Sequence, residues 1–213
     1  DLLIRQRTML VNALRGHLAE FGLVRARGAK ALDELLALIE GADVPPVAQV
    51  ALRPLVAQLA ASEAQIAALD GAIRDWHLNN EVSRRLATVP GIGPLTASAI
   101  AASVPDAGAF ANARQFAAWL GLVPRQNTTG GKPRLGSISK QGNAYIRRLL
   151  IIGAQSILRW TRPTRPTPWL LALLARRPRK VVAVALANKM ARIAWALLAR
   201  GECYRRPTMP AAA

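Results

Sequence analysis

The stretch Leu86-Ala-Thr-Val-Pro-Gly-Ile-Gly-Pro-Leu-Thr-Ala-Ser-Ala-Ile100 decides the fold, because it places a tight turn between two helical stretches. The turn itself is Pro90-Gly91-Ile92-Gly93. Two glycines separated by one apolar residue permit backbone torsions that other residues resist. The pattern therefore predicts a helical hairpin, with Ile92 in the core beneath it and Thr96 near the start of the second helix.

The backbone amides of this turn predict a phosphate-binding site. Free N–H groups at the start of the second helix would point out of the turn, and such a nest binds phosphate without reading bases. The stretch resembles a helix-hairpin-helix DNA-binding motif, although a purely structural turn between two helices gives the same pattern. The candidate nucleic-acid-binding residues here are Pro90, Gly91, Ile92, Gly93 and Thr96.

The rest of the sequence also favours helices, so the predicted fold class is all-α. Strand signals, which are runs of Val, Ile, Thr and Tyr bounded by turns, are nearly absent. Apolar residues instead recur at three- and four-residue steps. The predicted helices span about residues 1–26, 29–39, 47–78, 113–120, 143–160 and 179–200, with a loop over 121–142 and a proline-rich linker over 161–168.

The long helix over residues 47–78 predicts a coiled coil and, through it, a homo-oligomer. A long helix that packs within its own domain is the alternative. The seam positions, which alternate by four and three, are Leu55, Leu59, Ser62, Ile66, Leu69, Ile73 and Trp76. We therefore predict a helical, coiled-coil region over 1–82, a helical domain with the hairpin and a basic loop over 83–203, and a flexible tail over 204–213.

Positive charge is confined to the second half of the chain. The 213 residues carry a formal net charge of +17, yet residues 1–120 hold equal numbers of cations and anions. Residues 121–213 hold 18 Lys and Arg residues against Glu202 alone. Self-repulsion on this scale is tolerable where a polyanion neutralises it. Nucleic acid is the predicted partner, and an anionic membrane surface is the alternative.

Composition excludes several kinds of site. Cys203 is the single cysteine, so a disulfide within the chain is impossible and a cysteine-based zinc site is not expected. The sequence shows no signal-peptide pattern, and its most apolar stretch, residues 149–158, is too short to span a bilayer. His17 and His77 are expected to be surface or packing residues. Core packing rather than base stacking is expected for Trp119, Trp160, Trp169 and Trp195.

Residues 121–150 combine hydroxyls, glycines and cations in one stretch. A hydroxyl that attacks a phosphodiester needs cations to stabilise the developing charge, and small neighbours that let the backbone approach. On composition alone, a loop that only grips phosphate is favoured over one that carries a nucleophile. The hydroxyls are Thr128, Thr129, Ser137 and Ser139, and the cations, which are predicted to bind nucleic acid, are Arg125, Lys132, Arg134, Lys140, Arg147 and Arg148.

Several ordered motifs in this part of the chain resemble one known family. They are Leu86 to Gly93, Phe116-Ala-Ala-Trp-Leu-Gly-Leu-Val-Pro124, Thr129-Gly-Gly-Lys132 and Leu135-Gly-Ser-Ile-Ser-Lys-Gln-Gly-Asn143. Together they are similar to the transposase domain of the insertion sequence 110/1111 family. Residues 1–14 are similar to the helix that follows that family's acidic domain, so the likeness spans nearly the whole chain.

The resemblance implies a particular chemistry. Proteins of this family pair a RuvC-like domain bearing four acidic residues with the transposase domain, and a structured noncoding RNA is thought to guide them to donor and target DNA. Their nucleophile is a serine before Gly-Gly, where this chain has Thr128-Thr129; Ser137 and Ser139 are the fallback nucleophiles. The acidic domain lies outside this sequence. We therefore expect no metal site in this chain, Mg²⁺ only with that domain, and no DNA cleavage by the chain alone.

Three functions remain open from the sequence. The first is the DNA-binding C-terminal part of a bacterial recombinase that also binds guide RNA, in the cytoplasm and associated with the nucleoid. The second is a stand-alone helix-hairpin-helix nucleic-acid-binding protein without catalysis. The third is a basic membrane-surface protein. The family-like loop over residues 121–150 favours the first.

Overall fold

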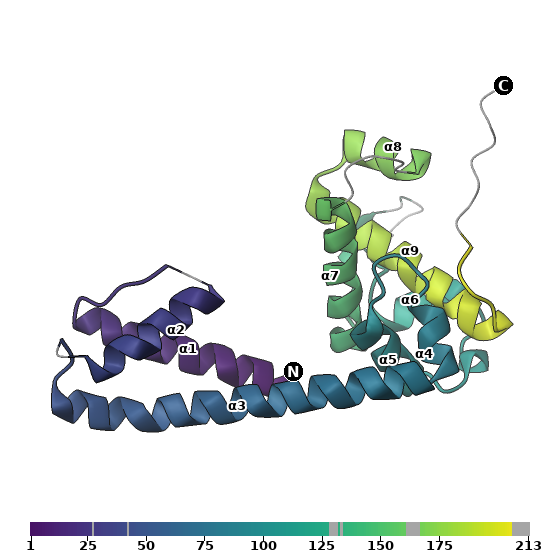
Figure 1. Ribbon diagram of the computed structural model, residues 1–213. Helices are drawn as coiled ribbons and strands as arrows, with labels where there is room; N and C mark the ends of the chain where they lie inside the picture. The colour runs from purple at the N-terminus through teal and green to yellow at the C-terminus, as the bar shows by residue number, and fades with distance from the viewer. Residues whose placement is uncertain (27, 42, 128–131, 133, 161–166, 206–213) are drawn as a thin grey trace. The chain divides into compact units, whose positions relative to one another are not determined.

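The computed structural model describes residues 1–205 apart from 27, 42, 128–131, 133 and 161–166 (Figure 1). Over these residues the chain forms helices and one two-stranded sheet, which confirms the predicted all-α fold class. The chain divides into two compact units, Asp1–Ala72 and Ile73–Ala213.

The first unit is built from three helical segments around a small apolar core. These are α1 (Leu2–Glu20), α2 (Ala29–Ala37) with a 3₁₀ turn over Leu38–Glu40, and the first part of α3 (Pro46–Asn79). Helix α1 ends earlier than its periodicity predicts. Gly22 adopts a left-handed φ of 75°, and the Leu23 amide turns back to bond Leu18 O. The buried core residues are Leu14, Leu18, Ile39, Val44, Leu52 and Leu59.

The predicted coiled-coil seam has two different environments along α3. Leu59 is buried in the core of the first unit, and Leu55 packs against that core. Farther along the helix, Leu69 is half exposed and Trp76 is exposed. The first part of the seam thus has a partner within its own unit, and pairing of α3 with a second copy stays a prediction.

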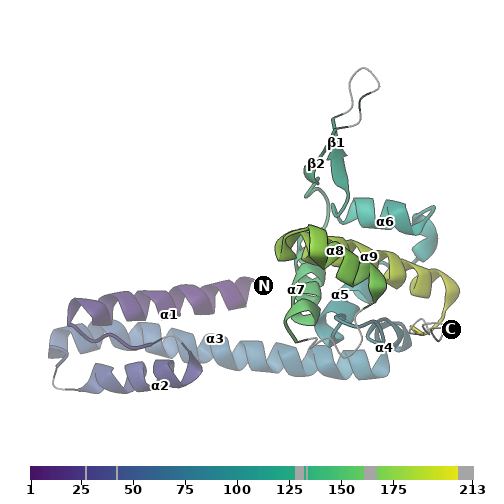
Figure 2. The ribbon, with the colours of Figure 1, turned by 90° about the horizontal axis from the view of Figure 1, so that it is seen from above.

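The second unit is organised around its last helix, α9 (Arg179–Arg200). The other helices are α4 (Glu81–Leu86), α5 (Pro94–Ser103), α6 (Ala113–Trp119), α7 (Ala144–Trp160) and α8 (Pro168–Arg176), with a 3₁₀ turn over Ala107–Ala109. Helices α4, α6, α7 and α8 all contact α9, and Figure 2 shows α8 lying over it. Close approach is possible because α9 turns small side chains inward at Ala183, Ala187, Ala191 and Ala194.

Helix α9 is also, among the described helices, the one that is long and apolar enough to cross a membrane by length and composition. Its apolar residues form part of the core of the unit, where Val182, Ala187 and Met190 are buried. Gly201 ends the helix in a left-handed conformation with φ 68°. Beyond it, the Tyr204 amide donates to Thr88 Oγ1 at 2.9 Å, so the predicted tail begins with an anchored residue.

A buried polar network connects the helices at the start of this unit. His77 Nδ1 lies 2.7 Å from Ser83 Oγ, which lies 3.3 Å from Ser98 Oγ. Asn80 caps α4 by accepting the Ser83 amide at 2.8 Å. These contacts join the end of α3 to α4 and α5, and they make His77 a packing residue.

The predicted loop over residues 121–142 contains a short β-hairpin. Strand β1 (Pro124–Gln126) pairs antiparallel with β2 (Leu135–Ile138), and Pro124 lies opposite Ile138. Neither strand has an alternating apolar face, because nearly all its residues are exposed. Backbone hydrogen bonds rather than side-chain burial hold the strands together, which is why hydrophobic periodicity predicted a loop.

Candidate nucleic-acid interface

The Pro90–Gly93 turn joins α4 to α5, as the sequence predicts. Ile92 is 3% exposed and Val89 is 2% exposed, so both side chains anchor the turn in the core. The Ile92 amide donates to Val89 O at 3.0 Å and closes the turn. This burial leaves Pro90 and Gly93 exposed on the outer side.

The two glycines of the turn have different roles. Gly91 has a φ of 83°, and a Cβ added to it would lie 2.7 Å from Ile157 Cδ1 and 3.0 Å from Gly153 O. Gly153 on α7 faces the turn in the same way, since its Cβ would lie 2.0 Å from Gly91 O. Gly93 has an ordinary φ of −85° and open space around it. Gly91 is therefore required for packing, whereas only Gly93 leaves room for a phosphate.

At the start of α5, the groups that could bind an anion are backbone amides rather than side chains. Pro94 has no N–H, and the first hydrogen bond runs from the Ala97 amide to Gly93 O. The Leu95 and Thr96 amides thus have no acceptor within the helix. The Thr96 side chain is buried, so its contribution to an anion site is limited to its amide.

The β-hairpin presents three of the six predicted cations to solvent. In Figure 2 it extends beyond the helices of its unit. Arg125, Lys132 and Arg134 are exposed, and the Asn127 amide bonds Arg134 O at 2.9 Å to hold the strands in register. Arg125 Nη2 donates to Ser139 O at 3.2 Å across the hairpin. The hairpin therefore forms an exposed basic arm.

The base of the hairpin is held by close backbone contacts. Gly121 and Gly142 both have left-handed torsions, with φ of 68° and 75°. A Cβ at Gly142 would lie 1.8 Å from Trp119 O, and one at Gly121 would lie 2.2 Å from Gln141 O. No larger residue fits either position without moving the backbone, which explains the glycines that flank this segment.

Lys140 is the one non-glycine residue of the described chain with a left-handed torsion, at φ 58°. Its amide donates to Gly121 O at 3.1 Å, and its side chain is exposed. A residue with a Cβ costs stability in this conformation. Lys140 thus adds a further exposed cation at the foot of the basic arm.

Arg147 and Arg148 of α7 differ in what they contact. Arg147 Nη1 donates to Leu120 O and to Gln141 O, both at 2.9 Å, and so ties together the two chain segments that enter and leave the hairpin. Arg148 is exposed, with its Cζ 5.4 Å from the centre of the Tyr145 ring. The Arg147 side chain is thus engaged by the hairpin base, and the Arg148 side chain lies at the surface.

Two of the candidate nucleophiles, Ser137 and Ser139, lie in or next to the hairpin. Thr128 and Thr129 fall outside the described residues. Ser137 is exposed on β2, and Ser139 is half-buried, with its amide bonded to Val123 O at 2.9 Å. Ser139 is held by the hairpin at both its amide and its carbonyl, which leaves Ser137 the more accessible of the two fallback hydroxyls.

Helix α7 carries both parts of the interface at different points along its length. Asn143 caps its start by accepting the Tyr145 and Ile146 amides at 3.1 and 3.0 Å, next to the hairpin base. The Pro90–Gly93 turn packs farther along, at Gly153 and Ile157. Within the described residues, no group of three or more His, Cys, Asp or Glu side chains could hold a metal ion.

Comparison with known proteins decides the family. Residues 83–169 match the model of the IS116/IS110/IS902 transposase family. A probable family 20 transposase of Pseudomonas aeruginosa is 50% identical over 209 residues, which cover 95% of this chain and 62% of that protein. The chain belongs to this family of insertion-sequence transposases.

Two further relatives are also insertion-sequence transposases. The transposase of insertion sequence element IS1111A from Coxiella burnetii is 42% identical over 210 residues, covering 96% of this chain and 58% of its own length. The transposase of element IS1328 from Yersinia enterocolitica is 35% identical over 208 residues, covering 97% and 62%. The chain thus matches these transposases nearly throughout and spans between half and two thirds of their length.

Proposed function

We propose that this chain is the DNA-binding C-terminal part of an insertion-sequence transposase and takes part in site-specific recombination. The observation that carries the proposal is the exposed basic arm, with Lys140 at its foot and an exposed Arg148 on α7, in a unit that the family model matches. Phosphate contacts fix a protein on DNA without reading sequence, and exposed Lys and Arg side chains are the groups that make them.

The Pro90–Gly93 turn supplies a second, smaller contact in this proposal. Gly93 is open to solvent and stands directly before the free amides of α5. A phosphate there would be held by backbone groups alone, as in helix-hairpin-helix motifs. Arg147 supports the interface by fixing the hairpin base rather than by direct contact.

The recombination chemistry would use a hydroxyl of the polar pair Thr128-Thr129. By family resemblance Thr128 or Thr129 attacks the DNA phosphorus, forms a phosphoester to the protein and releases a deoxyribose oxygen. Acidic residues and Mg²⁺ of a RuvC-like domain would activate this step, and a structured guide RNA would select the DNA. Because this chemistry would depend on the acidic residues of that domain, we expect nucleic-acid binding without catalysis from the chain by itself. Pairing along α3 would give the homo-oligomer.

The test is formation of a covalent protein–DNA adduct. The chain is incubated with Mg²⁺, DNA carrying the element's ends and the element's RNA, with and without the part of the Pseudomonas aeruginosa transposase that this chain does not cover. Denaturing electrophoresis should show an adduct only in the mixture, abolished by Thr128→Ala or Thr129→Ala and retained in Ser137→Ala and Ser139→Ala. A threonine-to-serine change at the attacking position should raise the yield. An adduct formed by the chain alone would contradict the proposal.

A further inference from the structure

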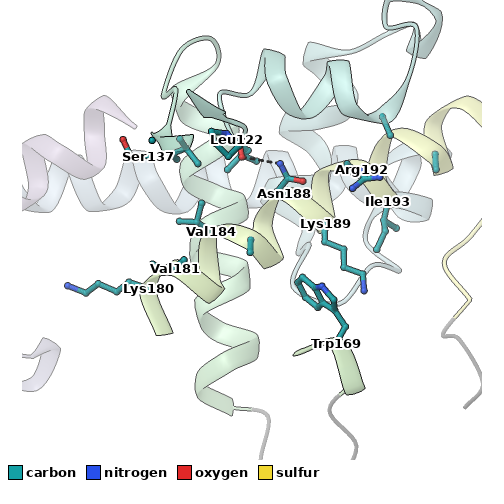
Figure 3. Close-up of a pocket in the computed structure, with 16 residues that line it drawn as sticks. Leu122, Ser137, Trp169, Lys180, Val181, Val184, Asn188, Lys189, Arg192 and Ile193 are labelled. Carbon is teal, nitrogen blue, oxygen red and sulfur yellow. Dashed lines mark hydrogen bonds between the residues drawn. The ribbon is translucent and has the colours of Figure 1, made fainter. Parts of the chain in front are cut away.

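An open groove of about 1020 Å³ runs along α9 between the hairpin and α8 (Figure 3). Its floor is one face of α9, with Val181, Val184 and Ile193 among the lining residues. Pro124 and Ile138 of the two hairpin strands form one wall, and Trp169 of α8 forms part of the opposite side. The groove is thus apolar inside and shares a wall with the hairpin strand that carries Ser137.

Cations are the ionisable groups of this groove. Among the described residues that line it, the charged side chains are Lys180, Lys189 and Arg192, and no carboxylate accompanies them. The Lys189 ammonium lies 4.4 Å from the centre of the Trp169 ring. Figure 3 shows the two side chains next to each other. The groove is therefore complementary to a ligand that combines negative charge with a flat apolar surface.

Trp169 does not have the buried position that its sequence context predicted. Its side chain is 39% exposed, so a large planar surface faces solvent beside an apolar floor. An exposed aromatic side chain flanked by cations is the arrangement that proteins use to hold single-stranded nucleic acid, because bases stack on the ring and phosphates meet the cations. A duplex would gain nothing from an apolar floor, since its base faces are already stacked on one another.

We propose that this groove binds an unpaired nucleotide, with the base against Trp169 and the α9 floor and the adjoining phosphates on Arg192 and Lys189. Either RNA or a melted DNA strand supplies that chemistry. The proposal rests on the proposed nucleic-acid function, but it uses residues distinct from the hairpin cations and the Pro90–Gly93 turn. Lys189 would exchange its contact with the indole for one with a phosphate when the base arrives.

The experiment measures binding of the 213-residue chain to four fluorescent oligonucleotides of equal length by anisotropy. They are single-stranded DNA, single-stranded RNA, the same DNA strand with abasic sites, and duplex DNA. We expect the strand with bases to bind more tightly than the abasic strand, although the two carry the same number of phosphates. The stronger of the DNA and RNA arms identifies the source of the unpaired nucleotide.

The variants locate the effect in the groove. Trp169→Ala should weaken binding of the base-containing strand by roughly 5- to 150-fold, the range of stacking on one aromatic side chain, and should leave abasic binding unchanged. Trp169→Phe should restore most of the affinity. Leu171→Ala, an exposed position of the same helix, is the matched control for α8, and Arg200→Gln is the charge control for Arg192→Gln on α9.

Each outcome separates this proposal from the function it rests on. Normal duplex binding together with equal affinity for abasic and base-containing strands would overturn the groove proposal and leave the DNA-binding function standing. Failure to bind any of the four oligonucleotides would overturn both. A Trp169→Ala variant that binds every oligonucleotide normally but changes its oligomeric state would assign the groove to a protein partner and contradict the proposal.

Discussion

Replacing Gly91 by alanine should destabilise the second unit far more than the same change at Gly93, two residues away in one turn. At Gly91 the new Cβ must adopt a φ of 83° and would lie 2.7 Å from Ile157 Cδ1 and 3.0 Å from a backbone oxygen of α7. The left-handed torsion costs about 1–2 kcal/mol. An extra carbon in a packed site costs typically about 1–3 kcal/mol more. The free energy of unfolding should fall by roughly 2–5 kcal/mol.

Gly93→Ala is the matched control, because φ there is −85° and nothing lies within 4 Å of the added carbon. Its free energy of unfolding should stay within about 1 kcal/mol of the parent. The Gly91→Ala change should therefore lower Tm by at least about 4 °C, whereas Gly93→Ala should leave Tm nearly unchanged. Thermal unfolding followed by circular dichroism measures both values. Equal Tm values for the two variants would refute the packing argument.

The same pair of positions separates structure from binding. Gly93→Val keeps an allowed torsion but places a branched side chain where a phosphate would approach. This variant should remain folded and should bind every DNA sequence more weakly. A folded Gly93→Val protein with unchanged DNA affinity would show that the turn is structural and does not bind phosphate.

Two further changes test the hairpin. Arg147→Met removes the donor shared by Leu120 O and Gln141 O. Unsatisfied polar groups cost about 1–3 kcal/mol, so hydrogen exchange at the Ser139 and Lys140 amides should become faster by roughly 5- to 150-fold. Unchanged exchange would show that Arg147 does not hold the hairpin base. Lys140→Gly should relieve the left-handed torsion and stabilise the fold by up to about 1 kcal/mol while weakening duplex binding. Loss of both stability and binding in Lys140→Gly would show that the lysine is there for packing.

The helices could largely be predicted from the sequence because their signals are local. Apolar spacing located them, and residues such as Asn143 and Gly201 set their ends through a side-chain cap and a left-handed torsion. The hairpin was missed because its strands are exposed on both faces, so no period-two pattern is present. The Gly-Gly pair of the sequence was the one available turn signal.

The sequence predicted which residues make up the candidate site, but it did not predict what each of them contacts. The sequence alone does not distinguish Gly91 from Gly93. The space around the two glycines differs because Gly153, which lies far along the chain on α7, packs against Gly91. Arg147 and Arg148 are neighbours, yet only the fold shows that two carbonyls engage Arg147. Trp169 was assigned to the core because its neighbours are apolar, whereas α8 covers α9 incompletely and leaves the indole exposed.

The salt dependence of duplex DNA binding tests the central claim most directly. Arg125, Lys132, Arg134, Lys140 and Arg148 are exposed, and five phosphate contacts give a log–log slope of about −4.5 against salt concentration. The variant Lys132→Gln/Arg134→Gln should make the slope less steep by about 1.8. The control Arg7→Gln/Arg74→Gln, which removes the same charge from exposed positions on α1 and α3, should leave it unchanged. A slope near zero for the parent chain, or an equal effect of both double variants, would contradict the account.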